Sequence, residues 1–245
     1  MRLAWIGAYT FATLGGSAVA MMAILALLHG GAPWVFYVGM GLGALLAGAV
    51  VTRQSPVTSY MEPAIGGLVA VITLLLGGAA SVRGFDLGSD HGLPWLMFIA
   101  LALGAATLTG VGAWFANSDR PPGFLSVLGV AMFVTMGLAM VVGLLAVWLA
   151  IELHGGGLVL FVVVFGILGG LVSQLIVARK ARLGCALGFP GVIAVEILAN
   201  LVSGRSVKGE LILGGIVMIV PGLVGALIGW RVKPKRTSDV LAAFD

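Results

Sequence analysis

A carboxylate inside an apolar segment is the residue of this sequence best placed to do chemistry. Glu196 lies about ten residues into residues 186–203, a stretch with no other charged residue. If lipid surrounds that stretch, a bare charge at its centre costs at least about 2.5 kcal/mol, so the carboxyl group must bind a proton or find a partner. Asn200 follows one helical turn later and can share the same face. We expect Glu196 and Asn200 either to handle a proton, a cation or a substrate, or to form a satisfied structural pair.

Two further polar residues are candidates to complete this site. Ser173 and Gln174 fall in the preceding apolar segment, about residues 157–178. If the two segments form a helical hairpin, these side chains can face Glu196 across it. The sequence therefore predicts a small polar group at depth, made from two neighbouring segments.

A pair of histidines stands at matching places in two other apolar segments. His29 and His154 each precede a run of glycines. Two such imidazoles could titrate near neutral pH or share a metal ion. The alternative is capping at the membrane interface, because no cysteine, aspartate or second histidine stands at ligand spacing around His29. A polar loop also contains acidic residues and the third histidine, at spacings that match no metal loop: Asp86, Asp90 and His91.

Motifs of the common enzyme classes are absent from the sequence. There is no glycine-rich phosphate loop ending in Lys-Ser or Lys-Thr, no His-Glu-x-x-His and no Gly-x-Ser-x-Gly. Intramembrane aspartyl chemistry needs two carboxylates at depth, and no aspartate lies inside an apolar segment. We therefore expect a protein that is not an enzyme and that needs no cofactor or metal.

The composition requires lipid as the solvent. Hydrophobic residues make up 60% of the 245 residues and charged residues 9%, and the mean hydropathy is +1.17. A soluble domain carries about a quarter charged residues, so a soluble fold is excluded. The net charge of +4 reflects membrane topology and contact with anionic lipid, because no basic domain for nucleic acid exists. Besides the bilayer, the partners that remain open are another membrane protein or a second copy of the chain.

Eight segments are long and apolar enough to cross a bilayer. Crossing takes about 20 apolar residues, and inside lipid only a helix satisfies its own backbone. The segments cover about residues 4–28, 33–52, 61–82, 93–116, 123–151, 157–178, 186–203 and 210–230. The sequence therefore predicts an all-α, polytopic membrane bundle of about eight transmembrane helices.

The basic residues predict the orientation of the bundle. With eight spans, ten lysines and arginines fall on the side of the N-terminus and three on the other side. Because basic residues accumulate on cytoplasmic loops, we expect both termini in the cytoplasm and the protein in the plasma (inner) membrane of a bacterium. The first apolar segment continues unbroken to Leu28, so we interpret it as an uncleaved helix and not as a secretory signal.

The first and fifth segments have nearly the same sequence. The alignment pairs Phe11 with Phe133 at an offset of 122 residues, and the offset grows to 127 where Pro63 pairs with Pro190. Each unit has four spans, an even number, so the two units must have the same orientation in the membrane. We expect one four-helix repeat over residues 1–120, a second over residues 121–232, and a short basic, then polar cytoplasmic tail over residues 233–245.

Small residues predict how the helices pack. Without a hydrophobic drive between helices in lipid, close approach at glycine is a main source of cohesion. Glycines four residues apart at Gly39 and Gly43, Gly166 and Gly170, and Gly225 and Gly229 therefore predict packing faces, within the chain or between copies. Pro221 should interrupt or kink the last segment. Cys185 should be a small packing residue.

Two functional classes remain. The first is a transporter or channel for an ion or small solute, with a pathway at the interface of the two halves and Glu196 as its proton or cation group. The residue that aligns with Glu196 in the first copy is Val69, so such a site is not duplicated. The second is a non-catalytic accessory or scaffold subunit, whose glycine-rich faces dock other membrane proteins.

Overall fold

The structure is a computed structural model that describes residues 3–28, 33–54, 60–81, 93–116, 123–148, 156–177 and 182–232. Within these ranges every regular element is a helix. The helices are α1 (Leu3–Leu28), α2 (Pro33–Thr52), α3 (Met61–Ser81), α4 (Leu93–Ala116), α5 (Phe124–Trp148), α6 (Gly156–Ile176), α7 (Arg182–Ala186), α8 (Gly188–Val202), α9 (Gly209–Val217) and α10 (Ile219–Val232).

In the described residues these helices follow the predicted apolar segments; α9 and α10 divide the last of them, and the short helix α7 ends where the seventh begins. The final segment breaks at Met218, between α9 and α10. Pro221 has no N–H to donate to the carbonyl four residues earlier, that of Val217, which explains a break at this point. Pro190 stands in the same relation to Ala186, where α7 ends. The predicted interruption by Pro221 is confirmed.

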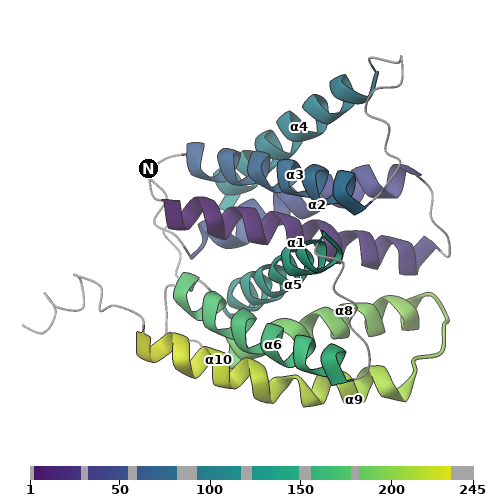
Figure 1. Cartoon of the computed structure of the whole chain (residues 1–245), viewed down its shortest axis with the longest axis vertical. Coiled ribbons are helices and arrows are strands. Elements are labelled where there is room, and N and C mark those ends of the chain that lie inside the picture. Colours follow the sequence, from purple (N-terminus) through teal and green to yellow (C-terminus); the bar gives the residue numbers. More distant parts are fainter. Residues whose placement is uncertain are drawn as a thin grey trace, which may run out of the picture.

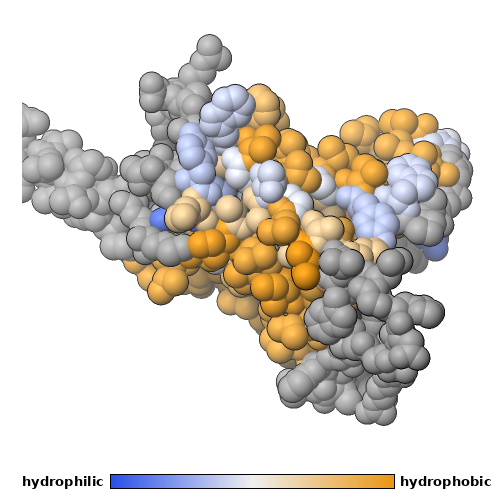
Figure 2. Space-filling view, turned by 90° about the horizontal axis from the view of Figure 1, so that it is seen from above, coloured by the Kyte–Doolittle hydropathy of each residue, from blue (hydrophilic) through white to orange (hydrophobic). Residues whose placement is uncertain are grey.

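Within the residues that the structure describes, five helical stretches are long and apolar enough to cross a membrane. They are Leu3–Leu28, Trp34–Thr52, Met97–Ala116, Phe124–Leu145 and Leu211–Val232. Three shorter apolar stretches accompany them, namely Met61–Leu76, Val163–Ile176 and Gly188–Val202. Large hydrophobic side chains on the outside of the bundle are exposed, and hydrophobic residues cover much of the described surface in Figure 2. The chain therefore forms a membrane-embedded helical bundle.

The helices run side by side around a central pair. Figure 1 shows α1 and α5 in the middle, with α2, α3 and α4 on one side and α6, α8, α9 and α10 on the other. Helix α1 contacts α2, α3 and α5, and α5 contacts α6, α7 and α8. The start of α1 and the end of α10 lie at the same end of the bundle, which we call the N-terminal end.

Glycines bring the central pair into backbone contact. A Cβ atom added at Gly15 of α1 would overlap the carbonyl oxygen of Phe133 on α5. In the reverse direction, a Cβ atom added at Gly137 of α5 would overlap the carbonyl oxygen of Phe11 on α1. No pathway can therefore run between α1 and α5 at this crossing.

The glycine pairs singled out in the sequence all pack within the chain. A side chain at any of the six would meet atoms of a neighbouring segment. Gly39 and Gly43 face α1, and Gly166 faces Met218 and the start of α10. Gly170, Gly225 and Gly229 lie on the contact between α6 and α10. The prediction of packing faces is confirmed, with the partner helices inside one chain.

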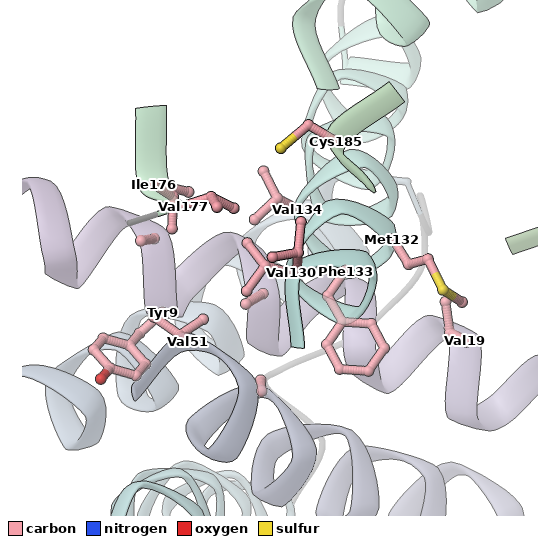
Figure 3. Packing of buried hydrophobic residues seen from close by; sticks show 14 of the residues in the cluster. Tyr9, Val19, Val51, Val130, Met132, Phe133, Val134, Ile176, Val177 and Cys185 are labelled. Carbon is pink, nitrogen blue, oxygen red and sulfur yellow. The ribbon is translucent and has the colours of Figure 1, made fainter. Parts of the chain in front are cut away.

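The larger of two core clusters in the described residues gathers around α5. Figure 3 shows side chains of α1, α2, α5, α6 and α7 meeting there, with Val130 and Val134 of α5 directed toward Val177 beyond the end of α6. Cys185 of α7 belongs to this cluster and is 1% exposed. Its predicted role as a packing residue is confirmed.

Candidate functional site

Helix α8 carries the deep carboxylate. Its buried positions Gly188, Val192 and Ala199 recur at helical spacing and form one face. Glu196 is one turn beyond Val192, and Asn200 is one turn further. Both polar residues are half-buried, while their helix is apolar in every other turn. The carboxyl and amide groups therefore occupy neighbouring turns at the margin of the buried face.

The helical geometry of α8 shows which helices lie next to Glu196 and Asn200. Val192 belongs to the core cluster around α5. Ile193 packs on α9, where its Cγ2 atom lies 3.3 Å from the Cβ position of Gly215. At about 100° per residue, Glu196 and Asn200 fall between the directions of Val192 and Ile193. Their side chains therefore leave α8 on the side between α5 and α9.

Ser173 and Gln174 are fully buried on α6, both at 0% exposure. The Cβ atom of Gln174 lies 3.1 Å from the Cβ position of Gly229, so this residue faces α10. The Ser173 hydroxyl has no hydrogen-bond partner among the described atoms. Burial of both residues is consistent with a polar group inside the bundle, but it does not by itself bring them to Glu196.

The structure separates these residues from Glu196. Gly169 of α6 and Gly188 of α8 both approach the hydroxyl of Thr135, which marks a common level. The two helices run in opposite directions from that level (Figure 1). Ser173 is four residues, about 6 Å, toward the N-terminal end, and Glu196 is eight residues, about 12 Å, toward the other end. Glu196 and Asn200 therefore form one candidate group, and Ser173 and Gln174 lie about 18 Å away along the bundle.

The predicted interfacial histidines, His29 and His154, lie outside the described residues, as do Asp86, Asp90 and His91. Within the part of the chain that the structure describes, no three residues among histidine, cysteine, aspartate and glutamate gather closely enough to hold a metal ion.

Two buried hydrogen bonds at the N-terminal end were not expected from the sequence. The Tyr9 hydroxyl of α1 lies 2.8 Å from Oγ1 of Thr52 on α2. Gln54, just beyond α2, donates from Nε2 to Oγ of Ser126 on α5 at 2.8 Å. Glu62 of α3 is 8% exposed and interacts electrostatically with Tyr9. The sequence feature that could have indicated these hydrogen bonds is a polar side chain inside or just after an apolar segment. Spacings typical of metal or catalytic sites do not include this feature.

Three comparisons, with protein-family models, with curated proteins and with solved structures, found no match to this chain. The candidate site therefore rests on the geometry of Glu196 and Asn200.

Proposed function

We propose that this chain is a transporter or channel of the bacterial plasma (inner) membrane, with eight spans in two parallel four-helix repeats and with both termini in the cytoplasm. The reciprocal crossing of α1 and α5 supports the repeat. Gly15 meets the Phe133 carbonyl, and Gly137 meets the Phe11 carbonyl. Because each of these residues and its counterpart are 122 positions apart, the contact has the form expected around a twofold axis.

A similar contact recurs away from the centre. Gly48 of α2 approaches the backbone of Thr109 on α4, and Gly170 of α6 approaches the backbone of Gly222 on α10. Gly48 and Gly170 are again 122 residues apart, whereas their partners Thr109 and Gly222 are 113 residues apart, so the fourth helix of each unit has a shorter offset. In a duplicated chain, a packing contact of this kind is inherited by both copies.

The third helix of each unit follows the same spacing. Gly66 packs on Tyr9 of α1, and Gly188 packs on Ala131 of α5. An offset of 122 residues therefore accounts for the packing better than the 127 residues that the pairing of prolines favours. With this offset, the counterpart of Glu196 is Leu74.

The contrast between Leu74 and Glu196 carries the functional proposal. Leu74 packs against an apolar cluster of Met40, Ala44, Val71 and Ala105 inside the first unit. At the matching place of the second unit stands a half-buried carboxyl group, with Asn200 one turn away. A carboxylate in the middle of a membrane helix is expensive and marks an ion or proton path more often than a packing site.

We therefore assign to Glu196 the binding of a proton or a cation, with Asn200 as a hydrogen-bonding neighbour. The pathway would run within the second unit, between α5, α8 and α9, because the crossing of α1 and α5 is closed by backbone contact. Ser173 and Gln174 would lie nearer the N-terminal end of that pathway.

Flux through reconstituted protein tests the proposal. Purified protein is placed in liposomes loaded with a pH-sensitive dye, and proton, sodium and potassium gradients are imposed in turn. We expect flux of one of these ions with the wild type and a loss of roughly tenfold or more with Glu196→Gln, because the ionisable group is gone. Glu62→Gln is the matched control, the same chemical change at the start of α3, and should leave flux unchanged.

Two results would contradict the proposal. Equal flux by the wild type and Glu196→Gln would contradict the role of Glu196 and leave the carboxyl group with a structural role. The other is absence of flux with the wild type together with a stoichiometric membrane protein that co-purifies in mild detergent. That second result would establish the accessory-subunit function instead.

A further inference from the structure

An apolar groove separates α1 from α6 at the N-terminal end of the bundle. Its walls are Trp5, Gly7 and Phe11 of α1 and Val172, Leu175 and Ile176 of α6. Its volume is about 360 Å³, within the range of sites that hold small molecules. We call this feature the α1/α6 groove.

The corresponding seam on the other side of the bundle is closed. There α2 and α5 approach each other, and the Cβ position of Gly129 lies 3.0 Å from Cγ1 of Val50. A hydrogen bond from Gln54 to Ser126 joins the two helices at the same level. The helices α1 and α5 correspond at an offset of 122 residues, as do α2 and α6, so this seam is the counterpart of the α1/α6 groove.

The two seams differ in a few side chains. Ser126 and Gln54 correspond to Ala4 and Ile176, which cannot form the hydrogen bond. Gly7 corresponds to Gly129, yet a Cβ atom at Gly7 would meet no atom within 4 Å. The α1/α6 groove is therefore open because the polar pair that draws its counterpart together is missing.

The surroundings of the groove indicate what fills it. Its lining is apolar, and Trp5 is of the residue type that favours the headgroup level of a bilayer. The same end of the bundle carries Arg53 after α2, Arg182 at the start of α7 and Arg231 near the end of α10. The guanidinium of Arg182 stacks 3.6 Å over the ring of Trp230, so positive charge is held at the level of an interfacial aromatic.

We propose that the α1/α6 groove binds an anionic phospholipid, with an acyl chain against Trp5, Gly7 and Phe11 and the phosphate at the basic N-terminal end. A phospholipid matches both the apolar walls and the positive end, whereas an uncharged apolar helix matches only the walls. Basic sites between membrane helices are known to select lipids in this way. The lipid site is independent of ion transport at Glu196.

Lipid exchange into purified protein tests this site. The delipidated full chain is titrated with dioleoyl phosphatidylglycerol or dioleoyl phosphatidylcholine in micelles, and bound lipid is counted by native mass spectrometry. Gly7→Leu places a side chain in the groove at a position where a Cβ atom meets nothing within 4 Å. We expect it to weaken binding of phosphatidylglycerol roughly sixteenfold if it displaces two methylenes of the acyl chain, because each methylene displaced from an apolar site weakens binding roughly fourfold. Gly104→Leu is the matched control, since Gly104 of α4 also has no atom within 4 Å of its Cβ position.

Charge variants give a second readout. The double variant Arg53→Gln, Arg231→Gln should remove the preference for phosphatidylglycerol over phosphatidylcholine, and Arg205→Gln, beyond the far end of α8, should not. Equal retention of phosphatidylglycerol by Gly7→Leu and the wild type would overturn the proposal. So would equal binding of the two lipids by the wild type, or a dimer of the chain that Gly7→Leu abolishes, because a second copy would then occupy the groove.

Discussion

Gly15→Ala tests whether backbone contact between α1 and α5 holds the bundle together. The single added methyl carbon overlaps the carbonyl oxygen of Phe133 and lies 2.6 Å from the amide nitrogen of Gly137. Both atoms belong to the backbone of α5, so no side-chain rotation can relieve the overlap. The two central helices must move apart.

The expected loss of stability follows from two opposing terms. Replacing glycine by alanine inside a helix favours the helix by about 1 kcal/mol. Overpacking against a rigid neighbour costs about 1–3 kcal/mol, and the upper end applies here because backbone faces backbone. We therefore expect Gly15→Ala to lower the free energy of unfolding by about 2 kcal/mol. Gly137→Ala should behave alike, and the double variant should cost less than the sum, since both glycines serve one crossing.

The measurement is unfolding in mixed micelles of mild detergent and dodecyl sulfate, followed by circular dichroism and tryptophan fluorescence. Gly104→Ala is the control, because a Cβ atom there meets nothing within 4 Å. It should be neutral or stabilising by up to about 1 kcal/mol. If Gly15→Ala unfolds at the same dodecyl sulfate fraction as Gly104→Ala, the central crossing does not have the backbone contact described above.

Three further predictions concern the N-terminal end. Tyr9→Phe removes the hydroxyl that bonds Thr52 and should cost about 1 kcal/mol of unfolding free energy in the same titration; an unchanged transition would show that this bond adds nothing. Ser126→Ala removes the acceptor of Gln54 and should cost about 1–2 kcal/mol. Because the seam between α2 and α5 should also loosen, we expect Ser126→Ala to bind a second phosphatidylglycerol molecule. Native mass spectra that show only one bound lipid would contradict this. Fluorescent reporters fused at either end of the chain should both be active in the cytoplasm, and activity at one end only would refute an even number of spans.

The positions of the helices were largely predictable. Apolar segments of about 20 residues bounded by Gly, Pro and charged residues fell within a few residues of the helix ends, as with residues 33–52 and α2. A proline removes a specific hydrogen bond, so the break at Met218 was also predictable from Pro221. The break between α7 and α8 was not predicted. Pro190 was placed near the start of the segment at residues 186–203, whereas the helical structure begins earlier, at Arg182.

The candidate site was predictable only in part. Glu196 and Asn200 share one margin of α8 because four residues make roughly one turn, which is a local property. Ser173 and Gln174 were expected opposite them, but the distance between groups on two helices depends on how far one helix slides along the other. That slide follows from the approach of Gly169 and Gly188 to Thr135, a contact made by α6 and α8 with α5.

By itself, the sequence determined the solvent, the helices and the small residues available for close packing. These follow from composition, segment length and residue type, which act locally. Only the tertiary structure decided that the centre between α1 and α5 is closed, that Ser173 and Gln174 lie far from Glu196, and that α1 and α6 leave an open groove. Each of these depends on the rotation and relative height of two helices, and packing between helices sets both quantities.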